Sequence, residues 1–253
     1  MKEWLQYAEL NNCSADDPVL VINDAARICY NSNLPEEDRN KMRQFVLNLI
    51  HNEHETPLEF VTFQFLVVTD RGTSHELVRH RLASFQQQST RYVKWDKGKV
   101  PFIMPTGMKR GSDEFAIWKE ACERSEQAYF DLIDKGCKRQ MARQVLNNSL
   151  ATVLVMQMNL REFRHFLKLR MAKAAHPAMQ FLALESAMAV LKEVPDANIL
   201  LHGCFEDEQI RKYEDEQASK EGTDTPDGPA EPIRQELAKP LRWWRKLTGR
   251  TQR

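Results

Sequence analysis

Apolar residues recur at helical spacing in several stretches of the chain. Between Asp16 and Cys29 they fall at Val19, Ile22 and Ala26, which lie on one face of a helix. The spacing predicts an amphipathic helix over residues 16–29. The same criterion, together with capping and turn residues, predicts further helices over residues 35–51, 113–135, 138–146, 159–170 and 177–192.

Two stretches have the β-branched and aromatic content of strands. Residues 60–69 read FVTFQFLVVT and end at an Asp-Arg-Gly turn signal, and residues 151–158 form the second predicted strand. After the turn, Thr73 or Ser74 can cap a helix that continues through Arg81. Because the helices and strands do not alternate regularly, the pattern predicts an α+β fold.

The bulk composition indicates a globular protein. Of 253 residues, 42% are hydrophobic, which is enough for a sizeable core, and Lys plus Arg and Asp plus Glu each number 36. This balance favours neither nucleic-acid binding nor attraction to a membrane surface. The polar start of the chain does not resemble a signal peptide, and no apolar run approaches the roughly 20 residues of a membrane span. We therefore expect a cytoplasmic protein.

The five cysteines are scattered and form no C-x-x-C pair, so we expect reduced thiols and no metal site. After Phe205 the composition becomes charged and rich in Gly and Pro, and the chain ends in a basic, aromatic segment containing Trp243 and Trp244. We predict a catalytic domain over residues 1–204 and a charged, disordered tail over residues 205–253.

A dense group of polar and cationic residues follows the first strand. Residues 79–92 read RHRLASFQQQSTRY, with Arg79, Arg81 and Arg91 beside hydroxyl and amide side chains. Guanidinium groups match phosphate oxygens, and amides can read the polar edge of a heterocycle. In a helix, Arg79 and Arg81 would not share a face, so surface amphipathicity explains them poorly. The segment therefore indicates a nucleotide site.

The triplet Arg79-His80-Arg81, followed after seven residues by Ser89, resembles the signature of flavin-dependent thymidylate synthases. Further segments resemble the family in the same order, and the similarity covers residues 1–204. They are AARICYNS at 25–32, HETPLEF at 54–60, STRY at 89–92, Ala142-Arg143, Asn159-Leu160-Arg161 and Leu169-Arg170. The resemblance implies an α+β fold of mixed helices with a small antiparallel sheet.

The resemblance also implies two sets of site residues. Those that would bind FAD are Thr56, Glu59, Arg79, His80, Arg81, Gln87, Asn159, Leu160, Arg161 and His165. Those that would bind dUMP are Glu76, Leu77, Val78, Arg79, Gln87, Gln88, Ser89, Thr90, Arg91, Arg143 and Arg170. Of these, Arg170 would be catalytic, because a fixed cation near uracil favours negative charge on the ring. The chain has no G-x-G-x-x-G, so side-chain cations would replace the phosphate-binding loop of dinucleotide folds.

In such an enzyme NADPH reduces FAD, 5,10-methylenetetrahydrofolate supplies the carbon, and dUMP becomes dTMP. No cysteine lies near the motif cluster, so the resemblance implies a route without a cysteine nucleophile, and Ser89 is interpreted as a binding residue. The family shares its sites between subunits of a homotetramer, so we expect an oligomer. The arginines from separate segments are expected to converge on two anionic ligands.

Two other classes of function remain open from the sequence. A nucleic-acid binder would use the basic triplet, Tyr92, Trp95 and the aromatic tail as phosphate contacts and stacking platforms. A metal-dependent hydrolase would be built on histidines, although no third ligand or carboxylate is evident beside them. The histidines concerned are His51, His54, His75 and His80.

Overall fold

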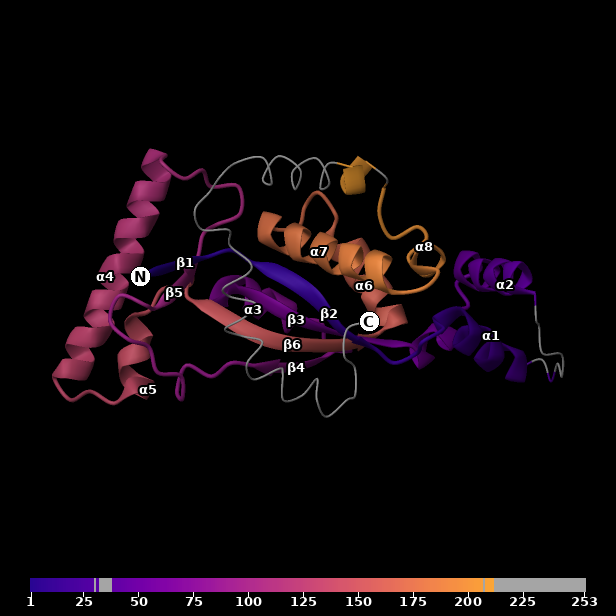
Figure 1. Cartoon of the computed structure of the whole chain (residues 1–253), viewed down its shortest axis with the longest axis horizontal. Helices are drawn as coiled ribbons and strands as arrows, with labels where there is room; N and C mark the ends of the chain where they lie inside the picture. The colour runs from indigo at the N-terminus through magenta and orange to yellow at the C-terminus, as the bar shows by residue number, and fades with distance from the viewer. Residues whose placement is uncertain (30, 32–37, 207, 212–253) are drawn as a thin grey trace. The chain divides into compact units, whose positions relative to one another are not determined.

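The computed structural model describes residues 1–29, 31, 38–206 and 208–211 (Figure 1). Its strands are β1 (Lys2–Trp4), β2 (Tyr7–Cys13), β3 (Thr62–Asp70), β4 (Ser84–Gln87), β5 (Pro101–Ile103) and β6 (Ala151–Asn159). Its helices are α1 (Pro18–Ile28), α2 (Arg39–His51), α3 (Arg71–Leu77), α4 (Asp113–Asp134), α5 (Arg139–Ala142), α6 (Leu160–Arg170), α7 (Pro177–Glu193) and α8 (Ala197–Leu200). Two 3-10 turns, η1 (Thr56–Phe60) and η2 (Arg143–Val145), complete the list.

A four-stranded antiparallel sheet in the order β2-β3-β6-β4 forms the centre of the fold, and β1 pairs separately with β5 in parallel. The two predicted strands, β3 and β6, pair along their whole length, from Thr62 opposite Asn159 to Asp70 opposite Ala151. The α+β prediction with a small antiparallel sheet is therefore confirmed.

Aromatic residues join this sheet to helix α6. Alternate residues of β3 point to one face, where Phe63 and Phe65 lie against Phe163 at ring-centroid distances of 5.4 and 5.1 Å. All three side chains are fully buried. Burial of each ring contributes roughly 1.5–3 kcal/mol, so this contact fixes α6 on the sheet.

Helix α6 begins where strand β6 ends. Asn159 is the last residue of β6, and its side chain accepts a hydrogen bond from the Glu162 amide at 2.9 Å. The predicted N-cap is thus confirmed. Because the strand and the helix share this residue, the register of β6 also fixes where the first turn of α6 stands.

Several sequence predictions need correction. The helix after β3 is capped by Asp70, not by Thr73 or Ser74, because the Asp70 carboxylate accepts from the Thr73 amide at 2.7 Å. It ends at Leu77 and does not reach Arg81. The first predicted strand begins two residues later than Phe60, which belongs to η1.

Strands β1, β2, β4 and β5 were not predicted, because they are stabilised by pairing with a partner strand rather than marked by strong alternation. Helices α1, α4, α6 and α7 lie close to their predicted bounds. Of the helix predicted over residues 35–51, residues 35–37 lie outside the described residues, as does the predicted tail from residue 212 onward. Among the described residues no helix is both long and apolar enough to cross a membrane.

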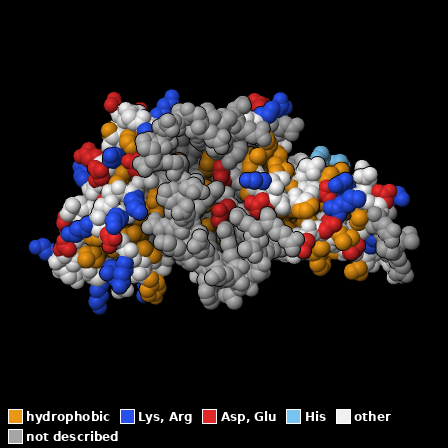
Figure 2. All heavy atoms as spheres, in the orientation of Figure 1, with side chains coloured by type: hydrophobic (Ala, Val, Ile, Leu, Met, Phe, Trp, Pro, Cys, Tyr) orange, Lys and Arg blue, Asp and Glu red, His pale blue; other side chains and the backbone are white. Residues whose placement is uncertain are grey.

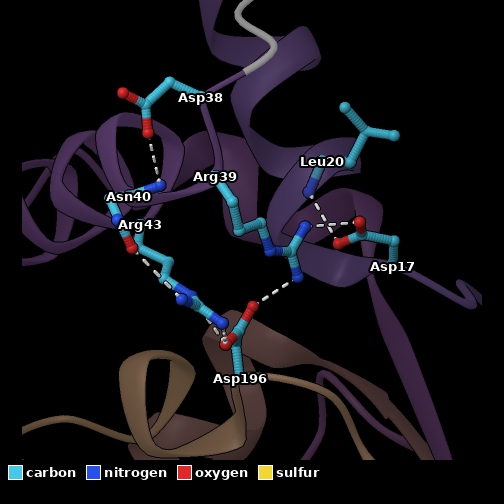
Figure 3. Close-up of polar contacts among 7 residues, drawn as sticks. All are labelled: Asp17, Leu20, Asp38, Arg39, Asn40, Arg43 and Asp196. Carbon is cyan, nitrogen blue, oxygen red and sulfur yellow. Dashed lines mark hydrogen bonds and ion pairs between the residues drawn. The ribbon is translucent and has the colours of Figure 1, made fainter.

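A carboxylate ties the C-terminal part of the unit to the first two helices (Figure 3). Asp196, next to α8, accepts from Arg43 Nε at 2.8 Å and also pairs with Arg39, which in turn contacts Asp17 at the start of α1. Burial alone would raise the pKa of Asp196, but the hydrogen bonds from Arg43 and Arg39 lower it. The ion pairs therefore favour the charged carboxylate.

Candidate active site

A pocket of about 790 Å³ gathers most of the side chains predicted to bind the flavin. Its volume lies within the roughly 300–1,000 Å³ of typical ligand sites. The described residues that line it are Glu55, Glu59, Arg79, His80, Arg81, Leu82, Asn159, Arg161, Glu162, His165, Leu169 and Arg170. Segments separated by about 80 residues thus meet in one place.

Helix α6 supplies one side of this pocket. Arg161, His165 and Leu169 are spaced by four residues, so they lie on one face of the helix. The opposite face carries Phe163 and Leu167, which are fully buried in the core. Burial of that apolar face leaves the polar face directed at the pocket.

The basic triplet supplies another side. Because α3 ends at Leu77, the triplet lies in successive turns, in which the Arg79 amide bonds the Glu76 carbonyl and the His80 amide bonds the Leu77 carbonyl. Arg79 and Arg81 are exposed and line the same pocket, whereas His80 between them is buried. This geometry is compatible with the expectation that both arginines belong to a binding site. They do not lie on a helix, however, because α3 ends before them.

A chain of hydrogen bonds runs through the pocket. Glu162 Oε1 lies 3.1 Å from His80 Nδ1, and Arg170 Nε donates to His80 Nε2 at 3.0 Å. Arg170 continues to Glu76, through Nη1 to the carboxylate at 3.2 Å and through Nη2 to the main-chain carbonyl at 3.3 Å. This chain connects α6, the triplet and α3.

Burial lowers the pKa of His80, and the neighbouring charge of Arg170 lowers it further, while the hydrogen bond to Glu162 opposes both effects. Burial is the larger of the two effects that lower the pKa.

The pocket also contains acidic side chains. Arg161 donates to the Glu59 carboxylate at 2.6 Å and lies 3.7 Å from Glu55. Of these, Glu59 and Arg161 were predicted from the family resemblance, whereas Glu55 was not. Glu55, Glu162, Leu82 and Leu169 also line the pocket but were not among the predicted site residues. Glu55 and Leu169 lie within segments that resemble the family, whereas Leu82 and Glu162 only adjoin such segments.

A second polar cluster lies around Thr90 and Gln87, outside this pocket. Arg143 Nη1 donates to Thr90 Oγ1 at 2.7 Å, and Gln87 Nε2 donates to Ser74 Oγ at 2.9 Å and to Thr152 Oγ1 at 3.1 Å. Thr90, Ser74 and Thr152 are buried. Arg79, Arg81, Arg161 and Arg170 line the pocket, whereas Arg143 belongs to the second cluster, and the predicted convergence on two ligands in an oligomer stays a prediction.

Arg71 joins this second cluster and was not predicted from the sequence. Its Nη1 lies 3.4 Å from Thr152 Oγ1. Burial lowers the pKa of Arg71, and the charge of Arg143 lowers it further. Among the described ion pairs neither arginine has a carboxylate partner. Because the charge of Arg143 disfavours the charge of Arg71, an anion bound near them would be stabilised.

Several predicted residues contribute differently than expected. The side chains of Leu77 and Leu160 are fully buried in the core, so only their main-chain groups could reach a ligand. Thr56 belongs to η1 but does not line the pocket. Val78, Gln88, Ser89 and Arg91, the remaining predicted residues, do not line the pocket.

The alternative functions find little support in this arrangement. On the face drawn in Figure 2, basic and acidic side chains are interspersed rather than gathered into one basic surface. Among the described residues no three His, Cys, Asp or Glu side chains are grouped to hold a metal ion. His80, which the hydrolase reading required, is already engaged by Glu162 and Arg170.

Comparison with known proteins identifies the family. Residues 11–196 match the family model described as thymidylate synthase complementing protein. Flavin-dependent thymidylate synthases from Geobacter sulfurreducens and Clostridium tetani are 33% and 32% identical to the chain, and in each case the match covers 71% of this chain and 80% of the relative.

A solved structure, the UMP/dUMP methylase PolB from Streptomyces cacaoi bound with 5-Br dUMP, has the same fold. It matches with a TM-score of 0.66 and 26% sequence identity, over 81% of this chain and 97% of that one. The resemblance drawn from the motifs is thus confirmed, and the chain belongs to the thymidylate synthase complementing protein family, the enzyme family of the flavin-dependent thymidylate synthases.

Proposed function

We propose that this enzyme converts dUMP to dTMP in the cytoplasm, with 5,10-methylenetetrahydrofolate as carbon donor and NADPH-reduced FAD as hydride source. The observation that carries the proposal is the convergence of the triplet and α6 on one pocket, with Arg79, Arg81 and Arg161 at its wall. The names of the relatives, and the dUMP analogue bound by the similar methylase PolB, support the same substrate.

The pocket residues fit FAD by their chemistry. Arg79 and Arg81 are exposed guanidinium groups suited to a pyrophosphate, and Asn159 and His165 can hydrogen-bond an isoalloxazine edge. Glu59 fixes Arg161 at the same wall. When bound, FAD would supply the hydride for the reductive step.

Arg71 and Arg143 are proposed to hold the phosphate of dUMP. The charge of Arg143 disfavours that of Arg71, and no carboxylate among the described residues forms an ion pair with either, so a phosphate dianion would relieve their repulsion. Thr90 orients Arg143 through the 2.7 Å bond to its hydroxyl. Ser89 serves as a further polar contact, because its hydroxyl accepts from the Arg91 amide and, among the hydrogen bonds of the described residues, contacts no base that could activate it.

Arg170 is proposed as the catalytic residue. Its guanidinium is held on three sides by His80 and Glu76, so its charge has a fixed position. A fixed cation beside the uracil ring stabilises negative charge as it develops there and makes the ring carbon a better nucleophile.

No cysteine is assigned to the reaction. Burial raises the pKa of Cys122 and of Cys204, which disfavours the thiolate that a nucleophile would need. No cysteine lines the pocket among the described residues. The proposed route therefore uses electrostatics rather than a covalent thiol adduct.

We also propose that the sites are shared between copies of a homotetramer. On α3, Glu76 contacts Arg170 in the pocket, whereas Ser74 contacts Gln87 in the second cluster. Because Ser74 and Glu76 are two residues apart in a helix, their side chains face roughly opposite directions. One ligand bound to a single copy would not touch both groups. Two copies facing each other would complete the site.

The deciding experiment is the visible spectrum of the purified protein, recorded anaerobically before and after NADPH and dUMP are added. We expect a flavin band that bleaches, and dTMP once methylenetetrahydrofolate is supplied. A colourless protein that instead binds single-stranded nucleic acid with a steep salt dependence would favour the nucleic-acid alternative and exclude this proposal.

Further support would come from Arg170→Ala. This change should abolish dTMP formation while the flavin spectrum and the fold, measured by circular dichroism, stay intact. Undiminished turnover would remove the proposed role of Arg170.

A further inference from the structure

Glu162 is a buried carboxylate in the first turn of α6, with a side chain only 6% exposed. Its main-chain amide is used by the Asn159 cap, and its carboxylate contacts His80 Nδ1 at 3.1 Å. A buried carboxylate costs free energy unless it is hydrogen-bonded, so the pairing with His80 accounts for its presence. The Asn159 cap uses only the main-chain amide at this position, so capping does not explain why the side chain is a buried carboxylate.

The hydrogen bonds determine the tautomer of His80. The Nε–H of Arg170 can only donate, so His80 Nε2, which lies 3.0 Å away, must carry the lone pair. In a neutral ring the proton is then on Nδ1, where it is donated to the Glu162 carboxylate. A doubly protonated His80 would direct an N–H at Arg170 and break that contact.

This acceptor helps to orient Arg170. A guanidinium has five N–H donors, and three of them are used by His80 and Glu76. One N–H on Nη1 and one on Nη2 remain for a ligand. If His80 Nε2 were lost as an acceptor, the group could rotate about the contacts with Glu76 and these two donors would change direction.

We propose that Glu162 is a positioning residue that acts through His80. Its carboxylate holds the proton on Nδ1, and so keeps Nε2 as the acceptor that aims Arg170 at the uracil ring. The proposal deepens the proposed function and rests on the role assigned there to Arg170. It requires that Glu162 has no effect on catalysis except through the imidazole.

The first test is Glu162→Gln, which keeps the shape but can donate from its amide to Nδ1 and so move the imidazole proton to Nε2. We expect kcat for dTMP formation to fall by about 10- to 100-fold, the cost of a misaimed catalytic group, while the dissociation constant of dUMP changes little. Glu126→Gln is the matched control. Glu126 is also a buried carboxylate, which accepts from the Val100 amide in a separate core, and its loss should leave kcat unchanged.

The second test uses His80→Gln and His80→Asn. The glutamine oxygen can take the place of Nε2 and accept from Arg170 without help from Glu162, whereas the asparagine amide reaches only the Nδ1 position. We therefore expect His80→Gln to retain more kcat than His80→Asn. Adding Glu162→Gln to His80→Gln should cause no further loss, because coupled residues are not additive. The comparison of His80→Gln with His80→Asn remains decisive even if Glu162→Gln folds poorly, because neither variant carries that change.

The pH profile gives a readout that a purely structural role would not move. The charged and titratable groups around His80 are Glu162, Arg170 and His165 on α6, and Glu76 beyond Arg170 on α3. Glu162 is the group that stabilises the protonated ring, so its removal lowers the pKa of His80. The acidic limb of kcat should then move to lower pH in Glu162→Gln, although the plateau falls.

The outcomes separate the two levels of the argument. Suppose first that Arg170→Ala is inactive. The positioning role of Glu162 alone is then overturned if the losses in kcat multiply in the His80→Gln/Glu162→Gln double variant. It is also overturned if Glu162→Gln leaves both kcat and the acidic limb unchanged. If Arg170→Ala still forms dTMP, the proposed role of Arg170 fails, and the positioning role fails with it. A fall in kcat that vanishes in the His80→Gln background supports the proposal.

Discussion

Replacing Asp196 by Asn tests the ion pairs that tie the C-terminal part of the unit to α1 and α2 (Figure 3). The change removes the charge but keeps the shape, and Asn tolerates the left-handed backbone that Asp196 adopts at φ 55°. Arg39 and Arg43 would then lie together without their shared carboxylate.

The size of the effect follows from exposure. The Asp196 side chain is 10% exposed, but those of Arg39 and Arg43 are 31% and 41% exposed, so solvent screens the pairs. Charged hydrogen bonds contribute about 1.5–3 kcal/mol when buried and roughly 0.2–1 kcal/mol at a surface, so we expect a loss of about 1–2 kcal/mol. For a chain of this size that lowers Tm by about 2–8 °C.

The sign of the pH dependence is also fixed. The pKa of Asp196 lies below its ordinary value of 3.8, so its contribution is present above about pH 4 and is lost as the pH falls through the folded value. The difference in Tm between wild type and Asp196→Asn should therefore be constant from neutral pH to about pH 5 and shrink below pH 4.

The assay is thermal unfolding followed by circular dichroism, at equal protein and flavin concentration, because ligands and assembly shift Tm. Asp134→Asn is the matched control, since Asp134 forms an exposed pair with Lys97 and should change Tm very little. Equal shifts in both variants, or a difference that persists unchanged at low pH, would show that the Asp196 pairs do not stabilise the fold in this way.

Three other predictions concern the core, the cap and the phosphate site. Phe163→Ala should lower the free energy of unfolding by about 3–5 kcal/mol in denaturant titrations, because the ring is fully buried between β3 and α6; a loss below 1 kcal/mol would contradict the packing. Asn159→Ala should cost about 1 kcal/mol in the same assay, through the lost bond to the Glu162 amide, and no change would mean that another group replaces the cap. Arg71→Gln should weaken dUMP binding by about tenfold or more in calorimetry, as expected for a lost charged hydrogen bond, but leave deoxyuridine binding unchanged; equal losses for both ligands would refute a phosphate contact.

Much of the fold and of the candidate site could be predicted from local sequence patterns. The strand over residues 60–69, the Asn159 cap and helices such as α7 follow from period, capping and turn chemistry, which involve only neighbouring residues. The triplet and Arg170 were marked by residue type and by resemblance to a family. Strand β4 was not predicted, because a four-residue strand is stabilised by pairing with β6 rather than by its own composition.

Local periodicity and short motifs were enough to predict the class of fold, the family and most of the cationic residues. Which of these residues meet could be learned from the folded chain alone. The folded chain ends the helix before the triplet, buries His80 against Glu162, and places Arg170 in the pocket but Arg143 against Thr90 in the second cluster. The physical reason is that burial, hydrogen-bond direction and charge proximity are properties of side chains brought together by β3, β6 and α6, and no spacing along the chain encodes them.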